Sequence, residues 1–172
     1  MSQLLAAAVE NQAPQIESAF EVLGYNQQLI QFADSKAGNL IVINSLFIAA
    51  AQAGHSSHPI LLKLLQVPLV FSAGLALLIC LLVIMNHSGL PKMPRKDCIF
   101  FLDIAQRKNM NQYVRDFTAS SEQDHLEDSL RRTYVLALIA SRKFSLYGWA
   151  QGLTATAAVI WLVHSGLSVV FS

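Results

Sequence analysis

Three long stretches without charged residues limit the folds open to this chain more than any other feature of its sequence. No Asp, Glu, Lys or Arg occurs between Lys36 and Lys63, between Lys63 and Lys92, or after Lys143. Each stretch is longer than the roughly 20 residues that an α-helix needs to cross the hydrocarbon core of a bilayer. The composition agrees with this reading. Of the 172 residues, 53% are apolar and only 13% are charged, whereas a soluble domain carries about 25% charged residues.

The charge-free stretches therefore predict an all-α membrane protein with three transmembrane helices and a small helical cytoplasmic region. Turn residues interrupt the first two stretches, so we predict the spans at residues 37–53, 64–86 and 147–170. The rest of the chain then forms a cytoplasmic N-terminal helix at residues 1–36 and a cytoplasmic helical sensor region at residues 87–146.

The basic residues predict the orientation of the spans. The segment between the first two spans has only Lys63, at its end. The segment between the second and third spans has ten basic residues: Lys92, Arg95, Lys96, Arg107, Lys108, Arg115, Arg131, Arg132, Arg142 and Lys143. Since basic loops stay in the cytoplasm, this segment and the N-terminus are predicted to be cytoplasmic, in a multi-pass protein.

Helical periodicity extends beyond the spans. Apolar residues recur at helical spacing from Ile16 to Ile30, and this predicted helix can run straight into the first span. Ser121 and Asp124 fit a capping box at the start of a second helix. No proline follows, so that helix can continue into the third span. Its pairs Glu127–Arg131 and Asp128–Arg132 each contribute about 0.2–0.5 kcal/mol.

Polar residues at the mouth of the first span allow two interpretations. Asp34 and Lys36 lie just before it, and Asn39 and Asn44 lie within it. In the first interpretation Lys36 anchors the helix at the interface and the asparagines hydrogen-bond across helices. In the second, the residues have a functional role, which we favour for Asp34 and Lys36 because a membrane acid is costly unless it is paired. Both interpretations stay open for Asn44.

Two further motifs concern assembly and metal binding. Gly148 and Gly152, continued by Thr156, form a small-residue face suited to close helix packing, and Gln151 beside them can hydrogen-bond across an interface. Glycine is also common in membrane spans without such a role. The motif His55-x-x-His58 supplies only two ligands, so we expect no metal site.

No catalytic constellation is visible. The sequence has no phosphate-cradling glycine loop, no nucleophile elbow and no zinc-protease helix. We therefore expect a protein that is not an enzyme and needs no cofactor. The net charge of +1 gives no field for binding a nucleic acid polymer. Cys80 lies in a predicted span and Cys98 outside it, so no disulfide is expected.

Three stretches, in this order, resemble a known family: FADSKAGNLIVINSLFIA, FFLDIAQRKNMNQYVRDF and EDSLRRTYVLALIASRKFSLYGWA. The family is the transmembrane effectors of Pycsar, the pyrimidine-cyclase antiphage defence, and the resemblance covers roughly residues 17–165. It implies an effector in the bacterial inner membrane that senses cyclic CMP or cyclic UMP and disrupts membrane integrity. Growth arrest or cell death then follows without catalysis by the effector.

The resemblance implies that the charged segments bind a ligand. We expect a cyclic pyrimidine mononucleotide to bind them, its phosphate near a basic group and its base stacked on an aromatic ring. The candidates are Arg107, Lys108, Arg115 and Arg131 for the phosphate and Tyr113 for the base. Differential binding of about 5.5 kcal/mol is needed to invert a 1:99 equilibrium, so several chains are expected to act together as a homo-oligomer in the lipid bilayer.

The resemblance also suggests a role for the membrane boundary. Asp34 and Lys36 are expected to pair with the Arg142–Lys143 region, forming with Asn39 a switch that transmits movement of the sensor. Two alternatives remain. The protein is an effector for another cyclic nucleotide or oligonucleotide, or it is a ligand-free membrane adaptor or small transporter subunit. A transporter typically has repeated halves, and no internal repeat is visible.

Overall fold

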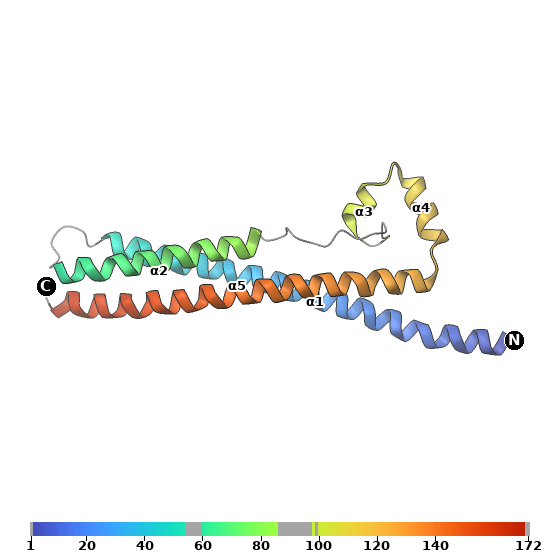
Figure 1. Cartoon of the computed structure of the whole chain (residues 1–172), viewed down its shortest axis with the longest axis horizontal. Coiled ribbons are helices and arrows are strands. Elements are labelled where there is room, and N and C mark those ends of the chain that lie inside the picture. Colours follow the sequence, from blue (N-terminus) through green and yellow to red (C-terminus); the bar gives the residue numbers. More distant parts are fainter. Residues whose placement is uncertain (1, 54–59, 86–97, 99, 171–172) are drawn as a thin grey trace. The chain divides into compact units, whose positions relative to one another are not determined.

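The computed structural model describes residues 2–53, 60–85, 98 and 100–170 (Figure 1). These residues contain no strand, which confirms the all-α prediction. In this part of the chain five helices follow one another: α1 (Ser2–Ala53), α2 (Ile60–Met85), α3 (Phe101–Ala105), α4 (Met110–Ala119) and α5 (Glu122–Val170). The chain divides into two compact units, Met1–Leu29 with Gly89–Ile139 and Ile30–Ser88 with Ala140–Ser172. Both α1 and α5 contribute to each unit.

Helix α5 begins where its capping residues predict. The backbone N–H and the hydroxyl of Ser121 both donate to Oδ2 of Asp124, at 2.9 and 2.8 Å, and the backbone N–H of Asp124 donates back to the Ser121 hydroxyl. This reciprocal arrangement satisfies amide groups that the first helical turn leaves without partners. No proline interrupts the following 49 residues, and the helix continues to Val170 as predicted.

Helix α1 also runs without a break into the predicted first span, but it begins earlier than the periodicity predicts. The sequence pattern starts the helix near Ile16, whereas α1 starts at Ser2 and contains Pro14. A proline inside a helix removes one backbone hydrogen bond and costs about 3 kcal/mol. The residues before it, SQLLAAAVENQA, are mostly strong helix formers, and they extend the helix past the proline.

The first unit joins the short helices α3 and α4 to the N-terminal part of α5. Arg132 of α5 contacts Asp103 of α3 at 3.4 Å, and the ring of Phe117 on α4 lies 4.8 Å from that of His125 on α5. The Asn109 side chain accepts a 2.9 Å hydrogen bond from the backbone N–H of Gln112 and caps α4. The five residues FLDIA form the short helix α3.

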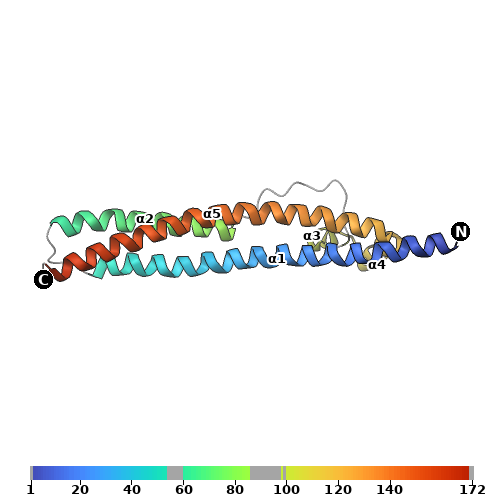
Figure 2. The ribbon, with the colours of Figure 1, turned by 90° about the horizontal axis from the view of Figure 1, so that it is seen from below.

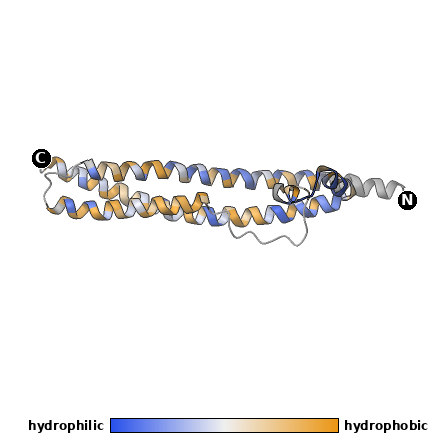
Figure 3. Cartoon of the chain, turned by 90° about the horizontal axis from the view of Figure 1, so that it is seen from above, coloured by the Kyte–Doolittle hydropathy of each residue, from blue (hydrophilic) through white to orange (hydrophobic). Residues whose placement is uncertain are grey.

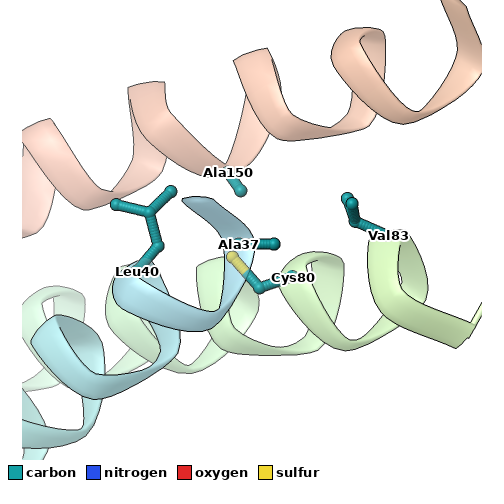
Figure 4. Packing of buried hydrophobic residues seen from close by; sticks show 5 residues of the cluster. All are labelled: Ala37, Leu40, Cys80, Val83 and Ala150. Carbon is teal, nitrogen blue, oxygen red and sulfur yellow. The ribbon is translucent and has the colours of Figure 1, made fainter. Parts of the chain in front are cut away.

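The second unit is a packed bundle of α1, α2 and α5, which lie side by side in both ribbon views (Figures 1 and 2). One apolar cluster joins Ala37 and Leu40 of α1 to Cys80 and Val83 of α2 and Ala150 of α5 (Figure 4). A second joins Ala51, Leu69, Ala73 and Ala157. Alanine at many of these contacts lets the three helix backbones approach closely.

Among the described residues, two helices are long and apolar enough to cross a membrane: α2, over Leu62–Met85, and α5. Apolar residues dominate α2 and the C-terminal part of α5 in Figure 3. The first segment covers the second predicted span as far as Met85, and α5 contains the third predicted span. The predicted first span, residues 37–53, is not among these segments; it has 17 residues, and the described part of α1 ends at Ala53.

Candidate functional site

An ion pair between Asp34 and Lys143 lies within the second unit. Nζ of Lys143 on α5 donates to Oδ1 of Asp34 on α1 at 2.5 Å. The Lys143 side chain is 1% exposed and that of Asp34 is 30% exposed. A buried ammonium group is costly unless a partner compensates its charge, so the carboxylate of Asp34 fixes the lysine in this position. The contact expected between Asp34 and the Arg142–Lys143 region is therefore present, through Lys143.

The other residues of the predicted boundary switch lie elsewhere. Lys36 is exposed, and its Nζ lies 5.1 Å from the centre of the Phe32 ring on its own helix. Asn39 on α1 and Arg142 on α5 are exposed as well. Of the five predicted boundary residues, the part of the chain that the structure describes brings only Asp34 and Lys143 into contact.

A buried hydrogen-bonded pair follows deeper in the same bundle. Nδ2 of Asn44, which is fully buried, donates to Oγ1 of Thr154 and to the carbonyl of Leu40, both at 2.8 Å. The Thr154 hydroxyl donates in turn to the carbonyl of Ala150. Asn44 therefore bonds across helices, as the packing interpretation expects. Its Oδ1 accepts no hydrogen bond from the described residues, so this amide is only partly satisfied.

Arg107, a predicted phosphate ligand, is held inside the first unit. Its Nε donates to Oδ2 of Asp116 at 2.8 Å, and its side chain is only 4% exposed. Nη2 lies 3.5 Å from Sγ of Cys98. Burial alone would lower the pKa of Arg107, but the hydrogen bond with Asp116 and the interactions with Cys98 and the Asp116 charge together outweigh burial and raise the pKa. The guanidinium thus stays charged and links the segment after α3 to α4.

The remaining predicted ligand residues differ in their freedom to bind. The Tyr113 ring lies 5.6 Å from the guanidinium carbon of Arg107, and its hydroxyl donates to the carbonyl of Cys98 at 3.5 Å. Arg131 pairs with Glu127 one turn earlier, as predicted. Lys108 and Arg115 are exposed, and neither side chain has a partner among the described residues. These two cations are the ones available to an anion.

Arg132 has partners that the sequence did not predict. The sequence predicts a pair with Asp128, one turn earlier on α5. In the structure it is buried, contacts Asp103 at 3.4 Å, and stacks its guanidinium 3.7 Å from the centre of the Phe100 ring. The available signal was Asp103, an acid within the apolar stretch IFFLDIA that needs a cationic partner.

An open apolar groove of about 490 Å³ lies between α1 and α5 in the first unit. Its volume falls within the range of small-molecule sites, roughly 300–1,000 Å³. No basic side chain lines it, so it offers contacts to an apolar or aromatic surface rather than to a phosphate. The lining residues are Pro14, Gln15, Ser18, Ala19, Val22, Leu126 and Leu130.

The predicted helix-packing glycines are open to the outside of the second unit. A Cβ built at Gly148 or Gly152 would have no neighbouring atom within 4 Å, so neither glycine is needed for packing inside this chain. The predicted small-residue face is therefore present but uncovered. His55 and His58 lie outside the described residues.

Comparison with known proteins finds one family. The chain matches the sequence model of the Pycsar effector protein domain over residues 18–171, which includes nearly all of the two units described above. No curated protein and no solved structure matches the chain. The match begins at residue 18, so the first turns of α1, which starts at Ser2, lie outside it.

Proposed function

The chain belongs to the Pycsar effector family and is thus an antiphage defence effector, and we propose that it senses cyclic CMP or cyclic UMP. Binding of the nucleotide to the first unit rearranges the helix bundle of the second unit. The bundle then disrupts the integrity of the bacterial inner membrane, and the cell stops growing or dies before phage mature. The protein performs no catalysis in this scheme, because disruption of the bilayer needs only a change in helix packing.

A third membrane span is part of the proposal. Residues Ala37 and Leu40 of α1 pack against Cys80 and Val83 of α2, and Ala51 of α1 packs against Leu69 and Ala73. The interval from Ala37 to Ala51 therefore runs alongside an apolar helix of membrane-spanning length. If α2 crosses the bilayer, this part of α1 shares its depth. The charge distribution then favours a cytoplasmic N-terminus.

The observation that carries the mechanism is the buried Asp34–Lys143 pair. It joins α1 to α5, the two helices that continue from the first unit into the second. Removing one partner of a buried pair costs about 3–5 kcal/mol, because the other charge is left uncompensated. The pair thus favours one packing of α1 against α5. A ligand that binds another packing of these helices more tightly must overcome this preference to shift the population of the protein toward that packing.

The ligand is proposed to bind at the cationic surface around α4. Lys108 precedes this helix and Arg115 lies on it, and both side chains are exposed. A cyclic mononucleotide has one negative charge, which two such cations can bind through charge-assisted hydrogen bonds. Tyr113 lies between them in sequence and is the candidate for stacking on the base. Several chains acting together supply the free energy for switching that one small ligand lacks.

Two measurements test this function. Calorimetry on the detergent-solubilised protein should detect heat with cyclic CMP or cyclic UMP and none with cyclic AMP. Cells that co-express the protein with an active pyrimidine cyclase should admit a membrane-impermeant dye, and cells with an inactivated cyclase should not. Heat only with a cyclic dinucleotide would change the messenger and keep the effector role. Absence of dye entry with the active cyclase would favour a membrane adaptor.

A further inference from the structure

Two carboxamide side chains face outward from the helix bundle of the second unit. Asn39 lies on α1 and Gln151 on α5, and both are exposed. Neither side chain forms a hydrogen bond with any residue that the structure describes. With α1 and α5 in the bilayer, as in the proposed function, both amides contact hydrocarbon. Lipid chains offer no hydrogen-bond partner, so amides in this position are stabilised by pairing with another polar group.

The surface around Gln151 allows another helix to approach closely. Gly148 and Gly152 flank it on α5, and the space beyond each Cα is open to at least 4 Å. Thr156, one turn further on, donates its hydroxyl to the carbonyl of Gly152 at 3.0 Å, so its polar group is used within its own helix. Glycine at two successive turns lets two helix backbones come into contact.

The two carboxamides lie at similar depth in the bundle. The contact Asp34–Lys143 joins residues 109 apart in sequence, and the contact Asn44–Thr154 joins residues 110 apart. Helices α1 and α5 thus run in register, and the position on α1 level with Gln151 is residue 41 or 42. Asn39 lies two or three residues from that level, which corresponds to about 3–5 Å along the helix. Extended carboxamide side chains span this difference.

We propose that the second unit binds a second copy of this chain, with Asn39 of one copy hydrogen-bonded to Gln151 of its neighbour over the Gly148–Gly152 face. An amide both donates and accepts, so the two groups satisfy each other. The surfaces are on different helices, so each copy presents one of each, and the contact is head-to-tail. Repeated contacts of this kind close into a ring when the rotation between copies allows it.

Cysteine cross-linking in native membranes tests the contact. The parent for these variants has Cys80→Ala and Cys98→Ser, so that it contains no other thiol. A chain with both Asn39→Cys and Gln151→Cys should give a ladder of dimers, trimers and larger species after mild oxidation. Two populations of chains, one with each substitution alone, should give dimers when they are co-expressed. The membranes are prepared with and without an active cyclase, and a ladder in either state supports the contact.

A matched control pair is Ser45→Cys with Gln151→Cys. Ser45 is exposed on α1 at a comparable distance from the level of Gln151, but about 120° around the helix from Asn39. It should cross-link at least tenfold less. Equal cross-linking of the control, dimers from Gln151→Cys alone, or no ladder in either state would overturn the proposed contact. Because the readout needs no messenger, its failure with dye entry intact would leave the proposed effector function standing.

Discussion

Lys143 of α5 is almost completely buried and donates to Asp34 of α1 at 2.5 Å, while the aspartate keeps 30% of its side-chain surface exposed. The two partners therefore differ in how much they depend on each other. Water reaches the carboxylate when the pair opens, but it does not reach the ammonium group unless the helices move. Separation of α1 from α5 therefore costs free energy mainly because it leaves the buried ammonium group of Lys143 without a counter-charge.

Removal of either partner tests this asymmetry. Asp34→Ala leaves a buried, uncompensated ammonium group and should lower the free energy of unfolding by about 3 kcal/mol, at the lower end for buried pairs because Asp34 is partly exposed. Lys143→Met leaves a carboxylate with access to water and should cost less. Because the pair favours the packing that the ligand must overcome, both variants should admit dye at a lower level of the messenger than the parent. The double variant Asp34→Ala, Lys143→Met should recover stability, which thermal unfolding in one detergent would measure.

Lys36→Ala is the matched control for this pair. The sequence-based hypothesis groups Lys36 with Asp34 in the switch, but the structure places it on the exposed side of α1, over Phe32. Lys36→Ala should therefore keep normal stability and dye entry. Loss of dye entry in this variant would restore Lys36 to the switch and would show that the buried pair does not act alone.

The exposed cations near α4 should determine ligand affinity. A hydrogen bond to a charged group contributes about 1.5–3 kcal/mol, so Lys108→Ala or Arg115→Ala should weaken binding of the cyclic nucleotide about 10- to 100-fold. Arg131 is engaged by Glu127, and Arg131→Ala should change the affinity much less. Titration calorimetry measures all three. An equal effect of all three substitutions would indicate nonspecific attraction of the anion to a basic surface.

Substitution of the open glycines should alter assembly without altering the fold of one chain. A Cβ at position 148 or 152 meets no other part of the chain within 4 Å, so the leucine side chain of Gly148→Leu or Gly152→Leu has room to point outward and thermal unfolding should change little. The bulkier side chain should keep neighbouring helices apart and reduce the oligomer mass in detergent. Gly74→Leu on α2 is the control, since Gly74 is also open but lies outside the proposed interface. Light scattering on the purified variants measures the mass.

The cross-helix hydrogen bond of Asn44 should make a small, measurable contribution to stability. Thr154→Val removes one of the two acceptors of its amide, and such bonds in membrane bundles are worth about 0.6 kcal/mol on average. Thr156→Val is the control, because the Thr156 hydroxyl donates to the carbonyl of Gly152 on its own helix. We expect unfolding to shift in the first variant and not in the second. A larger loss in Thr156→Val would contradict this assignment.

The membrane orientation can be tested independently of all the variants. A reporter fused after Ser172 should be active only in the periplasm, because a cytoplasmic N-terminus and three spans place the C-terminus outside. Cytoplasmic activity of this fusion would show that either the third predicted span or the predicted orientation is wrong. A second fusion within the segment between residues 87 and 97 should give the opposite result.

Local features of the helices could be read from the sequence because their causes act over a few residues. The capping box of Ser121 and Asp124 defines where α5 begins, and the absence of proline after Ser121 lets the helix reach its full length. The spacing of Glu127 and Arg131 predicts one contact on its surface. Hydropathy over about 20 residues predicts the apolar helix α2. Periodicity alone starts this helix near Ile16, whereas α1 starts at Ser2, because helix-forming residues continue on the N-terminal side of Pro14.

The contacts between helices were decided only by the tertiary structure. The sequence placed Asp34 near Lys143 on the assumption of equal depth, but it could not separate Lys143 from Arg142 or exclude Lys36. It did not pair Asn44 with Thr154, or Arg132 with Asp103. These partners depend on how far each helix is rotated about its axis, because one residue changes the direction of a side chain by about 100°. Packing of small residues such as Ala37 and Ala150 against distant segments sets that rotation.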